Sequence, residues 1–162
     1  GSRLKEYDEL LEHDSAYAEK GKAFVKLMKD VNEFLASIEL NSDMRPVDRT
    51  VTYQDSCHLA HGQKIRVAPR KLLNAVPGLK LREMPGADIC CGSAGIYNVL
   101  HTDLSMQILD AKMASVKAAK ADWIVTANPG CMLQLRAGAA RHQTAHEVLH
   151  VVEVLDRAYR NG

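Results

Sequence analysis

Hydrophobic residues in the first forty positions recur at spacings of three and four, which is the periodicity of an amphipathic helix. The pattern predicts helical structure over residues 3–40, and its apolar positions are Leu10, Leu11, Ala16, Tyr17, Phe24, Leu27, Met28, Val31, Phe34, Leu35 and Ile38. We expect a cap or a break between helices at Asp14-Ser15 and at Gly21. A polar linker over residues 41–49 follows, so we assign residues 3–49 to an N-terminal helical segment and linker.

From residue 50 onward, short apolar runs alternate with longer helical stretches. Strands are expected at about residues 50–53, 79–83 and 123–127 and just before His150. Helices are expected at about residues 69–75, soon after Gly95, at 103–119, from 129 and at 152–159. This alternation predicts one α/β domain over residues 50–162, with a parallel sheet between layers of helices in a three-layer, Rossmann-like arrangement.

Composition and charge narrow the classes of function. The 162 residues are 46% hydrophobic and 25% charged, which is typical of a globular domain. With a net charge of +1 and 5% aromatic residues, neither charge nor stacking favours a nucleic-acid partner. No apolar run approaches the roughly 20 residues of a membrane span, so no direct membrane insertion is expected. The polar N-terminus lacks a secretory signal, which favours a cytoplasmic location, and we interpret Gly1-Ser2 as the remnant of a cleaved tag.

Four cysteines form the candidate site: Cys57, Cys90, Cys91 and Cys131. In a reducing compartment, cysteines are metal-binding or catalytic more often than disulfide-bonded. Each cysteine motif is expected where a strand ends and a helix begins. In a parallel α/β sheet these points lie at one edge, so the fold would bring the four cysteines together. Helix N-termini at that edge favour thiolates, the form of cysteine that binds metal.

The adjacent pair Cys90-Cys91 is better suited to metal than to a disulfide. Neighbouring Cα atoms on a trans peptide lie about 3.8 Å apart, whereas disulfides prefer about 4.4–6.8 Å. Two neighbouring thiolates can instead bind different atoms of a polynuclear cluster. Gly92 and Gly95 would let the backbone approach such a cluster and donate amide hydrogen bonds to sulfur.

Polar residues near the first cysteine offer further roles. His58 and His61 are candidates for metal contact or proton relay, although loop histidines more often satisfy backbone groups. Asp55 is expected to cap the helix that follows. Three other histidines are spaced four apart: His142, His146 and His150. Because loop and strand are predicted over residues 145–151, these histidines would not align, and no second metal site is expected.

Two other chemistries stay open from the residues alone. A zinc-binding structural module would use Cys57, Cys131 and one or both of the adjacent cysteines. Thiol catalysis would use Cys90 or Cys91 as the nucleophile, but the sequence offers no clear general base beyond the two histidines. The spacing of the cysteines is not a common zinc pattern, which usually contains two Cys-x-x-Cys-like pairs.

Three separated motifs resemble the cysteine-rich CCG domain. They are Asp55-Ser56-Cys57-His58-Leu59-Ala60-His61-Gly62-Gln63, Cys90-Cys91-Gly92-Ser93-Ala94-Gly95-Ile96-Tyr97-Asn98, and Asn128-Pro129-Gly130-Cys131 with Gln134. The resemblance covers about residues 50–160 and looks closest to the C-terminal such domain of glycolate oxidase iron–sulfur subunits. Related domains occur in heterodisulfide reductase and in lactate-utilisation iron–sulfur proteins.

The resemblance implies a [4Fe–4S] cluster held by the four cysteines, with His58, His61 and Gly92 around it. It implies electron transfer from an FAD-containing subunit that oxidises a 2-hydroxy acid such as glycolate, at the inner face of the membrane through that complex. Full-length relatives carry a ferredoxin-like region and a second cysteine-rich half. This chain is therefore expected to be a fragment of a longer iron–sulfur subunit, without activity of its own.

One position departs from the fullest form of the motif, which ends in Cys-x-x-Cys. Here Gln134 replaces the last cysteine, as in the glycolate oxidase branch, and four cysteines remain. The departure disfavours the five-ligand noncubane cluster of heterodisulfide reductase. A thiol/disulfide redox domain like that of heterodisulfide reductase is the remaining alternative from the resemblance.

Overall fold

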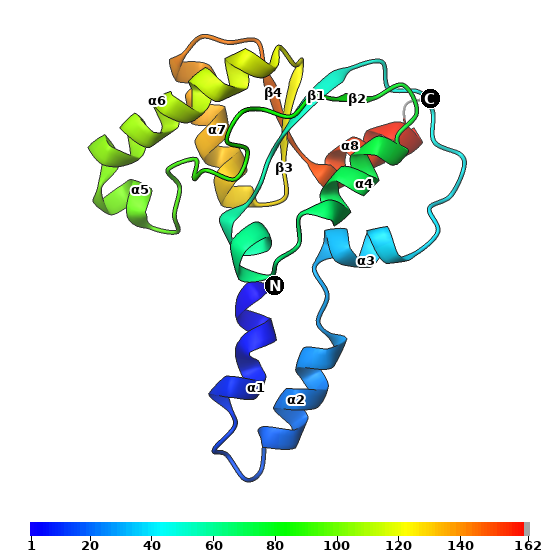
Figure 1. The fold of residues 1–162 in the computed structure, drawn as a ribbon, viewed down its shortest axis with the longest axis vertical. Helices are drawn as coiled ribbons and strands as arrows, with labels where there is room; N and C mark the ends of the chain where they lie inside the picture. Colours follow the sequence, from blue (N-terminus) through cyan, green and yellow to red (C-terminus); the bar gives the residue numbers. More distant parts are fainter. Residues whose placement is uncertain (161–162) are drawn as a thin grey trace.

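A sheet of four parallel strands lies at the centre of the computed structural model, which describes residues 1–160 (Figure 1). In chain order the strands are β1 (Thr50–Gln54), β2 (Lys80–Leu81), β3 (Trp123–Thr126) and β4 (Glu147–His150). Their spatial order is β2-β1-β3-β4, and each neighbouring pair is parallel. Parallel neighbours need a crossover between them, usually a helix, so the alternation in the sequence predicted this fold class correctly.

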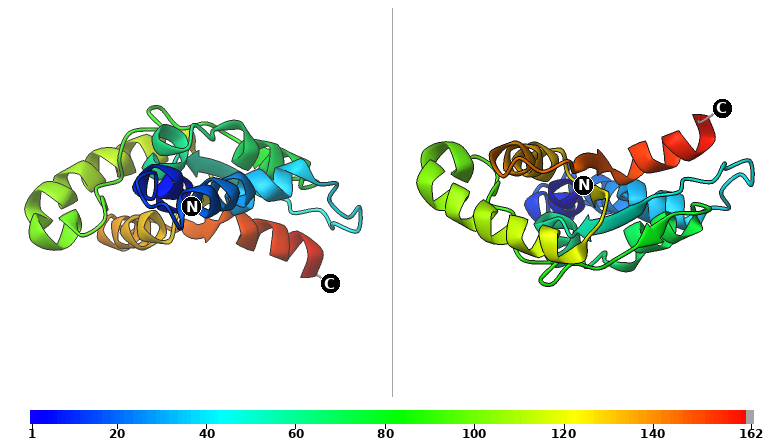
Figure 2. Two further views of the ribbon diagram at one scale, coloured as in Figure 1. Left: turned by 90° about the horizontal axis from the view of Figure 1, so that it is seen from below. Right: turned by 90° about the horizontal axis from the view of Figure 1, so that it is seen from above.

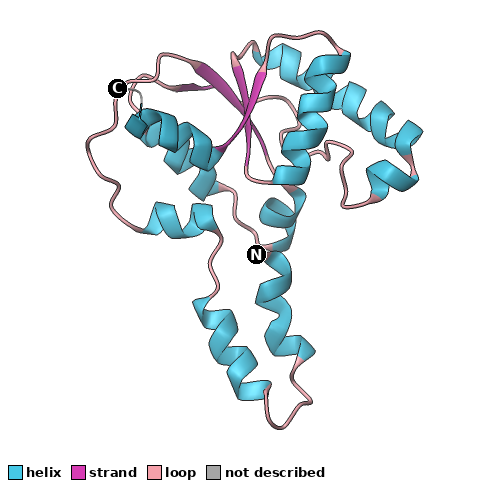
Figure 3. Ribbon diagram, turned by 180° about the vertical axis from the view of Figure 1, so that it is seen from behind, coloured by secondary structure: helices cyan, strands magenta, loops and turns pink. Residues whose placement is uncertain are grey.

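Helices cover both faces of the sheet (Figure 3). One face carries α4 (Val67–Ala75) and α8 (Val151–Arg160), and the other carries α6 (Thr102–Ala119) and α7 (Pro129–Arg141). Side chains of successive strand residues point to opposite faces. Tyr53 and Val125 accordingly pack into the core under α4 and α8, whereas Ile124 packs into the core under α6 and α7. Within residues 1–160, no helix is long and apolar enough to cross a membrane.

Helices also precede the sheet, as the periodicity predicted. They are the 3-10 helix η1 (Ser2–Glu6), α1 (Tyr7–Leu10), α2 (Ala18–Leu27) and α3 (Val31–Ser37). Helices α1 and α2 form a hairpin that projects from the α/β part in Figure 1 and is seen end-on in Figure 2. The break expected at Asp14-Ser15 is confirmed, because the Asp14 carboxylate accepts the backbone N–H groups of Ala16 and Tyr17 in a turn.

Gly21 does not break the helix, contrary to prediction, and lies inside α2. A Cβ at this position would lie 3.0 Å from the carbonyl oxygen of Tyr7, so the missing side chain lets α1 and α2 approach closely. The second break comes instead before α3. There, Asp30 accepts the N–H of Asn32, and the Glu33 carboxylate accepts the N–H of Asp30, which together form a capping box.

The segment after β2 is less regular than the sequence suggested. Only Lys80–Leu81 of the strand predicted over residues 79–83 pairs with β1. No regular element follows until α5 (Tyr97–Leu100). Residues 82–96 carry both adjacent cysteines, and we refer to them as the cysteine loop.

Candidate functional site

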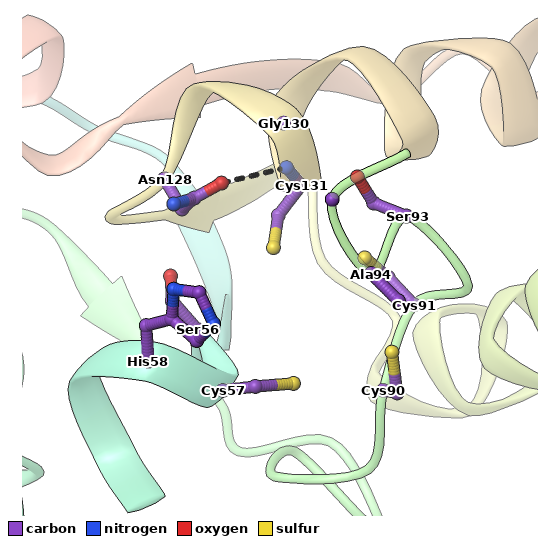
Figure 4. Close-up of a pocket in the computed structure, with 11 residues that line it drawn as sticks. Ser56, Cys57, His58, Cys90, Cys91, Ser93, Ala94, Asn128, Gly130 and Cys131 are labelled. Carbon is purple, nitrogen blue, oxygen red and sulfur yellow. Dashed lines mark hydrogen bonds between the residues drawn. The ribbon is translucent and has the colours of Figure 1, made fainter. Parts of the chain in front are cut away.

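All four cysteines line one cavity of about 170 Å³ at the carboxyl edge of the sheet. Figure 4 shows their sulfur atoms directed toward a common space from three separate segments. The sheet edge thus brings together residues that are far apart in sequence, as predicted. Cys91 and Cys131 are buried, and Cys57 and Cys90 are partly exposed. All four are free thiols in this structure.

Two of the cysteines begin helices directly after strands. Cys57 follows β1 and precedes a single π-helical turn, η2 (His58–Gly62). Cys131 lies in the first turn of α7, which Asn128 caps by accepting the Cys131 N–H at 3.1 Å. Pro129 at the first helical position suits this start because the first backbone N–H groups of a helix have no partner inside it.

The other two cysteines are placed differently from the prediction. Cys90 and Cys91 do not follow a strand end, because β2 ends at Leu81 and the cysteine loop separates them. Side-chain contacts and isolated backbone hydrogen bonds hold this loop, which forms no hydrogen-bonded ladder with a neighbouring strand. The Gln54 amide donates to the Ile89 carbonyl at 3.0 Å, and the Asp55 N–H donates to the Ala87 carbonyl at 3.0 Å. The last residue of β1 and the residue after it therefore hold the loop beside Cys57.

Gly92 is required by the shape of the cysteine loop. Its φ is +93°, and a Cβ would lie 2.5 Å from the carbonyl oxygen of Ser105 on α6. The Ser105 hydroxyl in turn donates to the Gly92 carbonyl at 2.8 Å. The Gly92 N–H donates to the Cys90 sulfur at 3.3 Å, which is the kind of amide contact expected from the sequence. Gly95 lines the same cavity, also with a positive φ.

Asp55 does not cap a helix, contrary to prediction, and instead forms an ion pair with Arg70 of α4. Both Asp55 carboxylate oxygens accept from the Arg70 guanidinium at 2.9 Å, and the Asp55 side chain is only 4% exposed. Arg70 also donates to Glu83 at 2.6 Å and lies over the Tyr53 ring. Because Asp55 adjoins the Cys57 turn and Glu83 lies in the cysteine loop, Arg70 connects the two segments.

The thiols of the cavity have different acidities. The pKa of Cys91 is lowered to about 6 because the Cys131 thiol donates a hydrogen bond to it and the Ser93 N–H adds another, although burial opposes the shift. The pKa of Cys131 is raised by that same hydrogen bond and by burial. Burial and the nearby Cys90 raise the pKa of Cys57 to about 11. Cys91 therefore becomes a thiolate more readily than Cys57 or Cys131.

Of the two candidate histidines that follow Cys57, one lines the cavity. His58 lines the cavity, whereas His61 is exposed and contacts Arg66 and the Asp88 carbonyl. The other three histidines do not align: His142 follows α7, His146 lies in a loop and His150 ends β4.

Further residues of the sequence motifs lie around the site or in the core. Asn98 donates to the Gln134 side chain at 3.3 Å, and Gln134 donates to Ser105 at 2.9 Å. The Gln134 side chain thus joins α7 to the start of α6 in the position where the fullest motif has a cysteine. The Tyr97 ring packs against the His101 ring in a tilted arrangement. Trp123 belongs to the core under α4 and α8.

The donor set fits a group with several metal atoms. Within residues 1–160, no three His, Cys, Asp or Glu side chains are close enough to hold one metal ion. Four sulfur donors surround the cavity, and no carboxylate lines it. A cluster with several irons suits this arrangement because each thiolate can bind a different atom, including the adjacent pair.

Several residues that shape the site could not be recognised in advance. Gln54, Arg70, Ser105 and Lys112 all contact the cysteine loop, but their partners lie 13 to 35 residues away in the chain. Of these four residues, only Lys112 could have been noticed in the sequence. It lies at a core position of the α6 periodicity, among Leu109, Met113 and Val116.

Comparisons with known proteins agree with the motifs. Residues 51–136 match the family model described as a cysteine-rich domain, CCG. A probable glycolate oxidase iron–sulfur subunit of Bacillus subtilis is 43% identical over 96% of this chain, and the glycolate oxidase iron–sulfur subunit of Escherichia coli is 34% identical over 97%. The chain spans 36% and 38% of the length of these two relatives. Lactate utilization protein A of Lysinibacillus sphaericus is 31% identical, with 94% of this chain and 68% of the relative covered.

Proposed function

The chain belongs to the family of the cysteine-rich CCG domain, and on this basis we propose that it is an iron–sulfur electron-transfer domain of a 2-hydroxy-acid oxidation complex. The single observation that carries the proposal is the convergence of four cysteine sulfurs on one cavity (Figure 4). The names of two bacterial relatives agree with the proposal, since one is a glycolate oxidase iron–sulfur subunit and the other is named a probable one.

In this proposal, Cys57, Cys90, Cys91 and Cys131 are the ligands of a [4Fe–4S] cluster, which supplies one-electron transfer when bound. The chain contributes the surroundings of these ligands. The Gly92 amide donates to the Cys90 sulfur, and such hydrogen bonds tune the potential of a cluster. Burial of Cys91 and Cys131 excludes water from one side of the site. His58 lies at the rim of the cavity, and His61 lies farther out on the same turn.

The partner in this proposal is an FAD-containing subunit that oxidises a 2-hydroxy acid of the glycolate type. The chain spans just over a third of the glycolate oxidase subunits that it resembles, so the remaining parts of a longer iron–sulfur subunit are partners as well. Electrons would pass from the flavin through this domain toward an acceptor at the inner face of the membrane. The support for this partner is the family relationship, together with a cavity whose four cysteine donors suit an electron-carrying cluster.

Anaerobic reconstitution with iron and sulfide tests the cluster. We expect about four irons per chain and the broad visible absorption of an iron–sulfur cluster. Single Cys→Ser variants at the four positions should each lose iron, whereas His61→Ala should keep it. Failure of the wild-type protein to take up iron would overturn the proposal, and one zinc per chain in its place would establish the structural zinc alternative.

The flavin partner is tested separately. The reconstituted protein, the flavin subunit and glycolate are combined without oxygen, and the cluster spectrum is followed. Bleaching of the visible absorption that requires both the flavin subunit and glycolate supports the electron path. No bleaching, with a cluster that dithionite still reduces, would remove the flavin subunit as the electron donor.

A further inference from the structure

Lys112 is a buried lysine in the middle of α6. The residue is 2% exposed and lies among core side chains, of which Met113 and Val116 are completely buried. Its ammonium group donates to the Gly86 carbonyl in the cysteine loop at 2.6 Å. No carboxylate of residues 1–160 forms an ion pair with it. A single carbonyl is thus the hydrogen-bond partner that the structure shows for a buried positive charge.

Such a charge is expensive to keep without an anion. Burying an ammonium group in a protein costs several kcal/mol even after the surroundings relax, and a buried cation therefore needs negative charge nearby. Asp88, the acidic side chain that influences Lys112 electrostatically, is half-exposed and already forms an ion pair with Arg66 at 3.2 Å. A methionine or leucine would fill the position in the helix without this cost. The lysine therefore points to a negative charge that the carboxylates do not provide.

The sulfur site lies on the same side of the core as Lys112, because Cys91 and Cys131 belong to the buried cluster that also contains Met113 and Val116. Burial lowers the pKa of Lys112, and the strongest opposing influence is the charge of Cys91, with smaller ones from Asp88, Cys90 and Cys57. Conversely, Lys112 helps to lower the pKa of Cys91. Lys112 also joins the same loop as the adjacent cysteines through Gly86. The shared cluster and the contact with Gly86 thus place a buried positive charge beside the segment that carries Cys90 and Cys91.

We propose that Lys112 is the fixed positive counter-charge of this sulfur site and raises the reduction potential of the cluster bound there. The inference rests on the proposed function. Four thiolates outweigh the positive charge of an iron–sulfur core, and a one-electron reduction adds another negative charge. A buried cation stabilises the more negative, reduced state more strongly than the oxidised state, because Coulomb energies are large where water is excluded. Lys112 acts as a positioning charge and is not a ligand.

The direct test is the midpoint potential of the reconstituted protein, titrated with dithionite and followed by EPR. Lys112→Met removes the charge and keeps a flexible chain of similar volume. Replacing a buried charge by an apolar side chain is often neutral or stabilising, so the variant is expected to fold. We expect Lys112→Met to shift the midpoint potential to a more negative value. Lys117→Met, on the exposed side of the same helix, is the matched control and should leave the potential unchanged.

Lys112→Arg separates charge from packing. A potential near the wild-type value in Lys112→Arg supports the proposal, because this variant keeps the charge. An equal drop in Lys112→Arg and Lys112→Met would overturn it in favour of a packing role. An unchanged potential in Lys112→Met, with unchanged iron content, would also overturn it.

Two separate readouts keep the two proposals distinguishable. A drop in the midpoint potential of Lys112→Met, together with a wild-type cluster that the flavin subunit and glycolate do not bleach, would leave the pairing of Lys112 with the sulfur site standing while the electron path fails. Bleaching by the flavin subunit and glycolate, together with an unchanged potential in Lys112→Met, would overturn the pairing while the electron path stands.

Discussion

Gly92 has both a positive φ and a close backbone neighbour, and each of them disfavours a side chain at this position. Its positive φ costs a residue with a side chain about 1–2 kcal/mol, and the close approach of the Ser105 carbonyl adds about 1–3 kcal/mol of overpacking. We therefore expect Gly92→Ala to lower the free energy of unfolding by about 2–5 kcal/mol, measured by urea denaturation.

Gly95→Ala is the matched control for this prediction. Gly95 also has a positive φ, but a Cβ at this position would meet no neighbouring atom within 4 Å, so only the backbone strain of about 1–2 kcal/mol is expected. Equal losses in the two variants would show that the contact with Ser105 does not constrain the cysteine loop.

Cys91 should ionise before Cys57 and Cys131 in the reduced, cluster-free protein. Its pKa is lowered to about 6, while the pKa of Cys57 is raised to about 11. Thiolate absorbance is expected to rise in a first step near pH 6 in the wild-type protein, and this step should be absent in Cys91→Ser. A first step above pH ~8.5, the ordinary cysteine value, would contradict the hydrogen-bond arrangement of the cavity.

The same ionisation affects stability in a defined direction. Folding lowers the pKa of Cys91, so its thiolate contributes stability that is complete above the unfolded-state pKa of about 8.5. That contribution is lost as the pH falls through about 6. The Cys91→Ser variant should therefore lose less stability between these pH values than the wild-type protein, as measured by urea denaturation of the cluster-free form.

Individual residues differ in how far the sequence revealed their roles. The four cysteines could be grouped because strand ends meet at one edge of a parallel sheet. Asp55 could not be assigned correctly, because a carboxylate after a strand suits a helix cap as well as an ion pair. Only the fold shows that Arg70 lies opposite Asp55 and Glu83, and that a buried lysine faces the loop.

The cysteine loop is an element without a hydrogen-bonded ladder, so its position depends on Arg70. Arg70→Met would leave the Asp55 carboxylate buried without its partner, and breaking a buried ion pair in this way costs about 3–5 kcal/mol. We expect a loss of this size in urea denaturation, together with faster hydrogen exchange at residues 82–96.

Arg141→Met is the control for the ion pair. Arg141 pairs with Asp110 between α6 and α7, but its side chain is 52% exposed, and exposed pairs contribute about 0–1 kcal/mol. A small loss in both variants, with unchanged exchange in the loop, would mean that Arg70 does not hold the two cysteine segments together.

Regular elements were predictable where periodicity was strong. The helix of α6 and the buried strand β3 fall close to their expected residues, because long periodic or continuous apolar runs have few alternative structures. Strand β2 was predicted too long, because alternation over five residues does not reveal how many of them find a partner. Gly21 was misjudged because close helix packing, like a helix end, favours glycine.

At the scale of the whole molecule, one part of the N-terminal region packs against the α/β core and another part does not. Leu35, Leu40 and Met44 pack against the core under α4 and α8, and the backbone of Arg45 and Val47 is hydrogen-bonded to Ala158 and Pro77. The α1–α2 hairpin, in contrast, projects away from the sheet (Figure 1). The division at residue 49 that the sequence suggested remains a prediction.

Two truncations test that division. Removal of residues 1–28 should leave the thermal unfolding midpoint of the α/β part close to that of the full chain, because the hairpin contributes no side chain to either core. Removal of residues 1–49 should lower the midpoint strongly, because it uncovers apolar surface on α4. Equal midpoints for the two shortened proteins would place the boundary at residue 49 after all.

The central claim is that the four converging cysteines hold an iron–sulfur cluster that carries one electron. EPR of the protein purified without oxygen, before and after reduction with dithionite, tests this claim most directly. The account predicts a signal that appears on reduction, belongs to a paramagnetic iron–sulfur cluster, and is lost in Cys131→Ser. An EPR-silent protein that contains no iron after anaerobic purification would contradict it.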